Sequence, residues 1–175
     1  MIIGMSIATF TILHVIITLI AIATGFIVMF GMVCSKKMSG WSAIFWLTTL
    51  LTSVTGFMFP IHGFTPALGV GGFAMVVLAI GLLARYIKRF AGSWRWIYAV
   101  TAVVSLYLNF FVLIVQAFQK IPLINPLAPV VGPPFAGATN TQFAIAQGVA
   151  LVFFVVMGVV MGVVTALKFR PVAAQ

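Results

Sequence analysis

The chain has 175 residues, of which 64% are hydrophobic and only 5% charged, and its mean hydropathy is +1.31. Soluble domains carry about 25% charged residues, so this composition excludes a soluble globule and predicts an integral membrane protein. Asp and Glu are absent, while nine Lys and Arg residues give a formal net charge of +9. The lack of carboxylates excludes Asp/Glu acid–base pairs and carboxylate-bound magnesium or calcium.

Five long apolar segments predict the fold class, which is an all-α integral membrane protein with five transmembrane helices in a single bundle. The predicted helices cover residues 7–33, 41–59, 66–87, 94–118 and 141–167. At about 1.5 Å per residue, each can cross a hydrocarbon core about 30 Å thick. They occupy most of residues 1–175, which we interpret as a single transmembrane domain.

The connection between the last two predicted helices, residues 120–140, is long and rich in proline. Prolines at positions 122, 126, 129, 133 and 134 exclude a regular helix there. The segment is also nearly uncharged, so we expect it to lie across the outer face of the bundle. Two readings stay open: a lid over a pocket, or a passive apolar cover.

Positive charge is concentrated in the connections that fall on one side of the membrane. With alternating spans, eight cations lie on that side and Lys120 alone on the other. Short cytoplasmic loops carry an excess of Lys and Arg, so we predict that the N-terminus is outside and the C-terminus cytoplasmic. Anionic lipid headgroups suit these cations better than nucleic acid does, and we expect no nucleic-acid partner.

The four tryptophans lie at or near the inner ends of the second and fourth predicted helices. Trp and Tyr are enriched at membrane–water interfaces. We therefore predict that all four act as interfacial anchors: Trp41, Trp46, Trp94 and Trp96.

Polar residues inside the spans predict a site, because hydrocarbon offers them no hydrogen-bond partner. They recur at helical spacing on the first, second, fourth and fifth helices, and most lie in the outer half of the bundle. His62 falls at the outer rim, in the connection between the second and third helices. The predicted ligand-binding pocket comprises His14, Thr18, Thr55, His62, Asn109, Gln116 and Gln147.

Several chemistries are open to such a pocket. The polar groups can simply bond one another as glue between helices. His14 and His62 can ligate the iron of haem b, or a histidine and a carboxamide can hold a quinone. Copper held by both histidines with Met5 or Met58 is a further metal hypothesis. Uncharged Thr, Ser and Asn stripes can also line a pore or carrier for a neutral solute.

Gly158 and Gly162 have the GxxxG spacing on the fifth helix. Small residues at this spacing let two helices approach closely within lipid. The pair therefore predicts close helix packing, either within the chain or between the subunits of an oligomer.

The segments TSVTGFMFPIHGFTPALGVGG, WRWIYAV and FRPV resemble small inner-membrane proteins of proteobacteria. The resemblance covers most of the chain and implies a multi-pass protein of the bacterial inner (cytoplasmic) membrane, but it brings no assigned chemistry. A general similarity to small haem-binding helical bundles is weaker, because their paired histidines on facing helices are not matched here.

The function we predict is a non-catalytic membrane subunit or accessory protein. It would pack against partner membrane proteins or against copies of itself within the lipid bilayer, and hold an apolar ligand in the outer pocket. A small redox protein binding haem b or quinone is the alternative, and a pore or carrier is the second alternative.

Overall fold

The computed structural model describes residues 2–34, 36, 38–60, 66–121, 123 and 141–168, with the side chains of residues 66, 67, 119, 120 and 165–168 outside the description. This part of the chain is all-α. It contains α1 (Ile7–Val33), α2 (Ser39–Phe57), α3 (Pro66–Leu82), a π-helical turn η1 (Leu83–Ile87), α4 (Trp94–Lys120) and α5 (Thr141–Lys168). The five predicted helices are confirmed, with bounds that differ by two residues at most once η1 is counted with α3.

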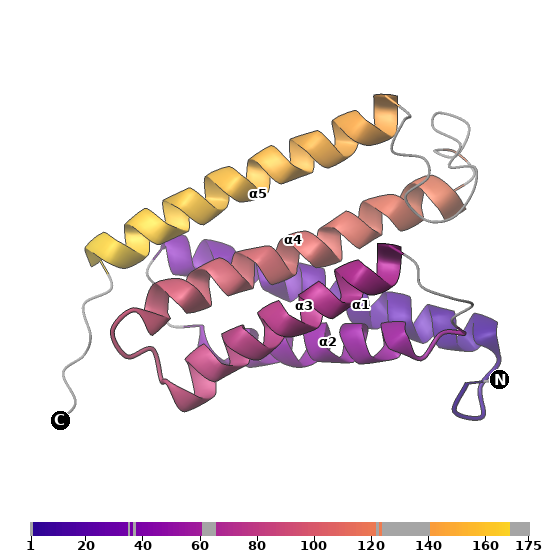
Figure 1. Ribbon diagram of the computed structural model, residues 1–175, viewed down its shortest axis with the longest axis horizontal. Helices are drawn as coiled ribbons and strands as arrows, with labels where there is room; N and C mark the ends of the chain where they lie inside the picture. Colours follow the sequence, from indigo (N-terminus) through magenta and orange to yellow (C-terminus); the bar gives the residue numbers. More distant parts are fainter. Residues whose placement is uncertain are drawn as a thin grey trace.

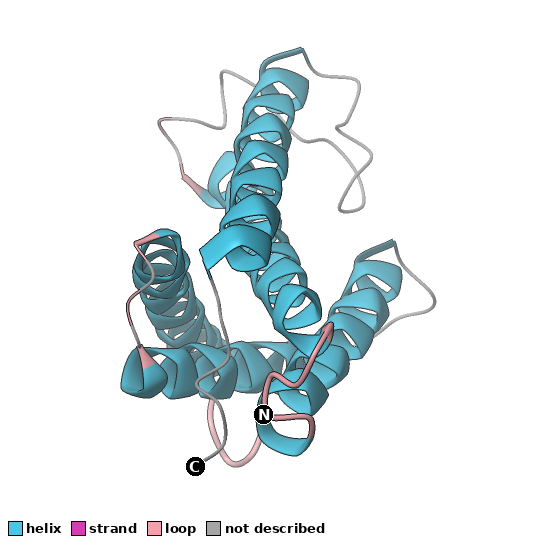
Figure 2. Ribbon diagram, turned by 90° about the vertical axis from the view of Figure 1, so that its left-hand side faces the viewer, coloured by secondary structure: helices cyan, strands magenta, loops and turns pink. Residues whose placement is uncertain are grey.

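The helices run up and down along the long axis of the molecule (Figure 1). The last turns of α1, α3 and α5 lie at one end together with the first turns of α2 and α4. The largest contacts are between α1 and α2 and between α4 and α5, and α3 packs on both α2 and α4. α5 therefore stands at the edge of the bundle, held chiefly by α4 (Figure 2).

Four of the helices are long and apolar enough to cross a membrane. These segments are Ile7–Val33, Leu68–Ile87, Trp94–Phe118 and Thr141–Val164. The chain is accordingly a multi-pass membrane protein by helix length and composition. α2, which we expected to be a fifth span, is not among the four, because its 19 residues include several Thr, Ser and Gly residues that lower its hydropathy.

The core lies mainly where α1, α2, α3 and α4 meet, and α5 adds Phe154 and Met161 to it. The largest fully buried side chains of the core include Trp46, Phe45, Met29, Leu78 and Leu106. Two glycines let the backbones approach these side chains. A Cβ at Gly25 would lie 2.6 Å from Leu106 Cδ1, and one at Gly81 would lie 2.7 Å from Trp46 Cζ3. The side chains of Leu106 and Phe45 occupy the space beside Gly25, and the Trp46 ring occupies the space beside Gly81.

The prediction that all four tryptophans are interfacial anchors is wrong for Trp46. Its side chain is 1% exposed, and its Nε1 donates a hydrogen bond to Tyr98 Oη at 3.1 Å. Trp41 and Trp96 are 45% and 52% exposed and remain compatible with an interfacial position. Trp46 lies one turn further into α2 than Trp41, on the face that meets Tyr98 and Gly81, and this tertiary contact overrides the general preference of tryptophan for the interface.

Candidate functional site

α2 carries a line of polar side chains that hydrogen-bond to the neighbouring helices, which we call the polar seam. Its members on α2 are Ser42, Trp46, Thr49, Thr52 and Thr55. Their spacings of three and four residues place them on the side of α2 that faces the bundle. The seam reaches α4 through Tyr98 and Asn109, and α1 through Thr18 and His14.

One end of the seam is centred on Tyr98. Its hydroxyl is 2.6 Å from Ser42 Oγ and also accepts the indole N–H of Trp46. All three side chains are 5% exposed or less. Sequence analysis missed Tyr98, although it precedes Thr101 by three residues and so continues the polar stripe of α4.

In the middle of the seam, Asn109 Nδ2 donates to Thr49 Oγ1 at 3.3 Å, and both side chains are buried. Ser105 lies one turn before Asn109 on the same face of α4. Its hydroxyl is buried and has no hydrogen-bond partner among the residues that the structure describes. Buried polar groups are normally bonded, so this part of the seam carries unused hydrogen-bonding capacity.

The other end of the seam joins His14 to Thr55. His14 Nδ1 is 2.7 Å from Thr55 Oγ1, and the Thr55 hydroxyl donates its own hydrogen to the carbonyl of Leu51, also at 2.7 Å. A hydroxyl has one hydrogen to give, so we assign the proton of this contact to Nδ1, which then donates to Thr55. A neutral His14 ring then has Nε2 as its acceptor, which is the form that binds a metal or a hydrogen-bond donor.

Thr18 extends this contact by one turn of α1. Its hydroxyl donates to the His14 carbonyl at 2.8 Å and lies 3.4 Å from Thr52 Oγ1. Phe59 packs its ring edge-on against the His14 ring, with centroids 5.4 Å apart. The histidine is thus held by α2 on one side and by an aromatic ring on another.

The two predicted glutamines lie on α4 and α5. Gln147 Nε2 donates to the Phe111 carbonyl at 3.2 Å, beside an apolar cluster built on Val115 and Phe143. The Oε1 atoms of Gln116 and Gln147 are buried, and neither has a hydrogen-bond partner among the described residues.

The predicted pocket residues therefore take part in separate contacts. His14, Thr18 and Thr55 meet between α1 and α2, Asn109 joins α4 to α2, and Gln147 joins α5 to α4. His62 lies outside the described residues, as does nearly all of the predicted cover at 120–140. The described residues contain no group of three His, Cys, Asp or Glu side chains that could hold a metal ion. A common pocket, and a site shared by His14 and His62, stay predictions.

An apolar groove of about 320 Å³ lies on another face of the bundle, between α3, α4 and α5. Its lining includes Phe73, Val103, Tyr107, Leu151, Phe154 and Gly158. Gly158 contributes to the groove by lacking a side chain, since a Cβ there would lie 3.7 Å from Val103 Cγ1. For Gly162, its partner in the GxxxG pair, no heavy atom of the described residues lies within 4 Å of such a Cβ.

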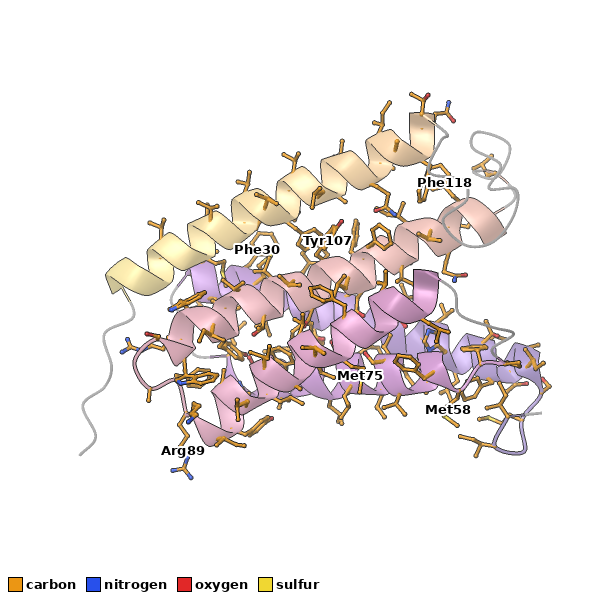
Figure 3. The ribbon with its side chains drawn as sticks, viewed as in Figure 1. Phe30, Met58, Met75, Arg89, Tyr107 and Phe118 are labelled. Carbon is orange, nitrogen blue, oxygen red and sulfur yellow. The ribbon has the colours of Figure 1, made fainter. Side chains whose placement is uncertain are left out.

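Tyr107 is the residue of this groove with a polar group (Figure 3). Its ring packs on Phe154 and Phe111, with centroids 5.7 and 6.1 Å apart. Its hydroxyl makes no hydrogen bond to the described residues. Sequence analysis missed Tyr107 because it is flanked by leucines in an apolar run, and no spacing rule separates it from ordinary core aromatics.

Comparisons with family models, with curated proteins and with solved structures gave no match to this chain. The findings describe a small helical protein with four candidate membrane spans.

Proposed function

We propose that the protein is a non-catalytic, multi-pass membrane subunit that packs against a second transmembrane helix through α5 and holds an apolar ligand in the groove beside it. The observation that carries the proposal is a line of six exposed, β-branched side chains along α5, which we call the α5 stripe. It consists of Ile145, Val149, Val152, Val156, Val159 and Val163, all at least 52% exposed.

The α5 stripe has the spacing of a helix-packing seam. Its members are separated by four, three, four, three and four residues, which is the heptad spacing of left-handed helix pairs. β-branched side chains are stiff, so they lose little rotamer freedom when packed. Helices associate within lipid mainly by van der Waals packing rather than by a hydrophobic driving force. A stiff, regular stripe therefore favours a helix partner, and a second copy of α5 is the simplest one because the stripe matches itself.

The groove supports the second part of the proposal. Its volume of about 320 Å³ is at the lower end of the roughly 300–1,000 Å³ of small-molecule sites. It is open and lined by apolar side chains, which suits part of an acyl or isoprenoid chain. A lipid tail is the occupant we propose, because the surface that lines the groove is apolar, and the apolar part of a quinone is the alternative.

We infer that α2 is the fifth span, despite its low hydropathy. From Ser42 onward, the hydroxyl side chains of α2 bond to α1, to α4 or to the backbone of α2 itself. Apart from Ser39 in the first turn, its exposed side chains are apolar. These exposed residues are Trp41, Ile44, Leu47, Leu51, Val54 and Phe57. A helix with polar groups inside and apolar groups outside suits lipid. Five spans would put the two termini on opposite sides of the membrane. Together with the excess of Lys and Arg on one side, this supports our proposal that the N-terminus is outside and the C-terminus is in the cytoplasm, with the protein in a bacterial inner membrane.

Cysteine crosslinking tests the α5 stripe. In a background with Cys34→Ser, Val152→Cys and Val156→Cys should form disulfide-linked dimers in native membranes if the partner is a second copy. Val155→Cys is the matched control, since Val155 is 56% exposed but lines the groove instead. Equal crosslinking at all three positions would reflect random collisions and contradict the proposal. A partner of another sequence would instead copurify, and Val152→Trp and Val156→Trp should release it.

Gly158 and Gly162 of α5 test the groove. Gly158→Leu would fill it, and native mass spectrometry should then show loss of a copurifying lipid or quinone. Gly162→Leu, which meets open space, should keep the bound molecule. Retention by both variants would show that the molecule binds elsewhere.

A redox protein is the second candidate, favoured by the tautomer that Thr55 imposes on His14. The test is a visible absorption spectrum of the purified protein, oxidised and reduced. A Soret band that His14→Ala abolishes and Thr48→Val preserves would establish haem, and a flat spectrum would eliminate it. A pore or carrier would show flux of a neutral solute into liposomes that Asn109→Leu alters.

A further inference from the structure

The basic residues at one end of the bundle have no carboxylate in this chain to pair with. The sequence has nine Lys and Arg residues and no Asp or Glu, so no salt bridge between side chains can form within one molecule. Four of these cations, Arg85, Lys88, Arg89 and Arg95, lie between residues 85 and 95, where η1 and a short turn join α3 to α4. Their charge must be balanced from outside the chain.

Neutral groups hold three of these cations in position. Arg85 Nη2 donates to the Ser39 carbonyl at 2.8 Å, while its Nε is buried without a hydrogen-bond partner among the described residues. Lys88 Nζ lies 5.4 Å from the ring centroid of Trp94, and Arg95 Nε donates to the Phe90 carbonyl at 3.2 Å. Carbonyls and aromatic faces orient a cation but leave its net charge in place.

The backbone of the turn places Arg89 on the outside. Arg89 and Phe90 both have positive φ, at 45° and 61°, a conformation that non-glycine residues adopt mainly when the surrounding structure imposes it. Phe90 packs its ring edge-on against buried Tyr98, with centroids 4.9 Å apart. With Phe90 fixed in the core, Arg89 extends away from the bundle (Figure 3).

Exposed aromatic side chains mark this end as the level of lipid headgroups. Tyr86 and Trp96 are 56% and 52% exposed, and each directly follows one of the four cations in sequence. Aromatic residues of this kind gather at membrane interfaces. Arg and Lys side chains at this level meet phosphate oxygens, which the guanidinium group binds through paired N–H donors.

We propose that Arg85, Lys88, Arg89 and Arg95 form a binding site for the phosphate group of an anionic phospholipid, such as phosphatidylglycerol. This lipid stabilises the fold by supplying the negative charge that the chain lacks. The site is separate from the α5 stripe and from the groove. A negative result for this site would therefore leave the proposed function unaffected, and the reverse also holds.

The test measures thermal unfolding of the full-length protein in nanodiscs of phosphatidylcholine with increasing phosphatidylglycerol. The wild-type Tm should rise with the anionic lipid, and the rise should shrink at high salt. Lys88→Gln combined with Arg89→Gln should lose at least half of the rise. Both side chains are exposed, so the double variant should fold, which its circular dichroism checks. Arg85 is left intact because it also holds α2.

Lys120→Gln is the matched control, because it removes one charge at the far end of the 27-residue α4, roughly 40 Å away at 1.5 Å per residue. It should keep the rise. If Lys120→Gln lost as much of the lipid-dependent rise in Tm as the double variant, the proposed site would be wrong. It would also be wrong if added phosphatidylcholine alone raised the Tm equally. Glycerophosphate added in solution should not raise the Tm, and a rise equal to that of the lipid would show that the site takes a free anion instead.

Discussion

Replacing Gly81 with alanine tests the closest approach in the core. The new Cβ would lie 2.7 and 2.8 Å from Cζ3 and Cζ2 of Trp46, and closer still to Cη2. Real Cβ atoms are essentially never found so close to another heavy atom, so either α3 or the indole must move. The indole has little freedom, since it is 1% exposed, contacts Phe45 and donates to Tyr98.

The expected loss of stability is about 1–3.5 kcal/mol. Overpacking a well-filled core costs about 1–3 kcal/mol. A displaced indole would also weaken its hydrogen bond to Tyr98, worth about 1 kcal/mol. The better helix propensity of alanine returns only about 0.5–1 kcal/mol. The measurement is reversible unfolding in mixed micelles with increasing SDS, followed by circular dichroism.

Gly72→Ala is the matched control in the same helix, because no heavy atom in the described part of the chain lies within 4 Å of a Cβ there. It should unfold like the wild type or slightly later. In the Gly81→Ala background, Trp46→Phe should recover part of the loss, since a smaller ring leaves room for the methyl group. If Gly81→Ala were as stable as Gly72→Ala, the packing of α3 against Trp46 would be wrong.

The remaining predictions concern the polar seam. Thr55→Val, which removes the acceptor of His14 Nδ1–H, should cost about 0.6–2 kcal/mol in the same unfolding assay and shift the ¹⁵N resonances of the His14 ring. Thr48→Val is the control and should leave the stability nearly unchanged, because Thr48 bonds only to carbonyls of its own helix. If Thr55→Val left the His14 ¹⁵N resonances unchanged, the tautomer assigned to His14 would be wrong. Tyr98→Phe should destabilise by about 1–3 kcal/mol, because it leaves the Trp46 N–H and the Ser42 hydroxyl without their partner. Tyr86→Phe, at an exposed position, is its control, and equal stability of the two variants would mean that Tyr98 makes no effective bond.

The helices could be predicted from sequence because their signal is local. An apolar run of some 20 residues can satisfy its backbone in lipid only as a helix, so α1, α3, α4 and α5 follow from composition and length. Proline at position 66 and the glycine and serine before Trp94 mark helix starts in the same local way. The orientation of the chain and the identity of its membrane stay predictions, because they depend on which side of the membrane the cations occupy.

The grouping of polar residues required the tertiary structure. Periodicity placed Thr55, Thr49 and Asn109 on helix faces but could not say which faces meet. The structure pairs His14 with Thr55 and Asn109 with Thr49, and it places Gln147 against the Phe111 carbonyl instead. The position of Trp46 was misjudged for the same reason, since Gly81 and Tyr98 come from other helices.

By itself, the sequence determined that this is a helical membrane protein with no carboxylate chemistry and with its cations gathered in a few connections. These properties depend on composition and on runs of neighbouring residues. Only the tertiary structure decided that α2 is the centre of the hydrogen-bond network, that Gly158 opens onto a groove while Gly162 does not, and that Arg89 is turned outward by the packing of Phe90. Each of these depends on contacts between residues far apart in the chain, whose pairing is set by how five helices pack together rather than by any one of them.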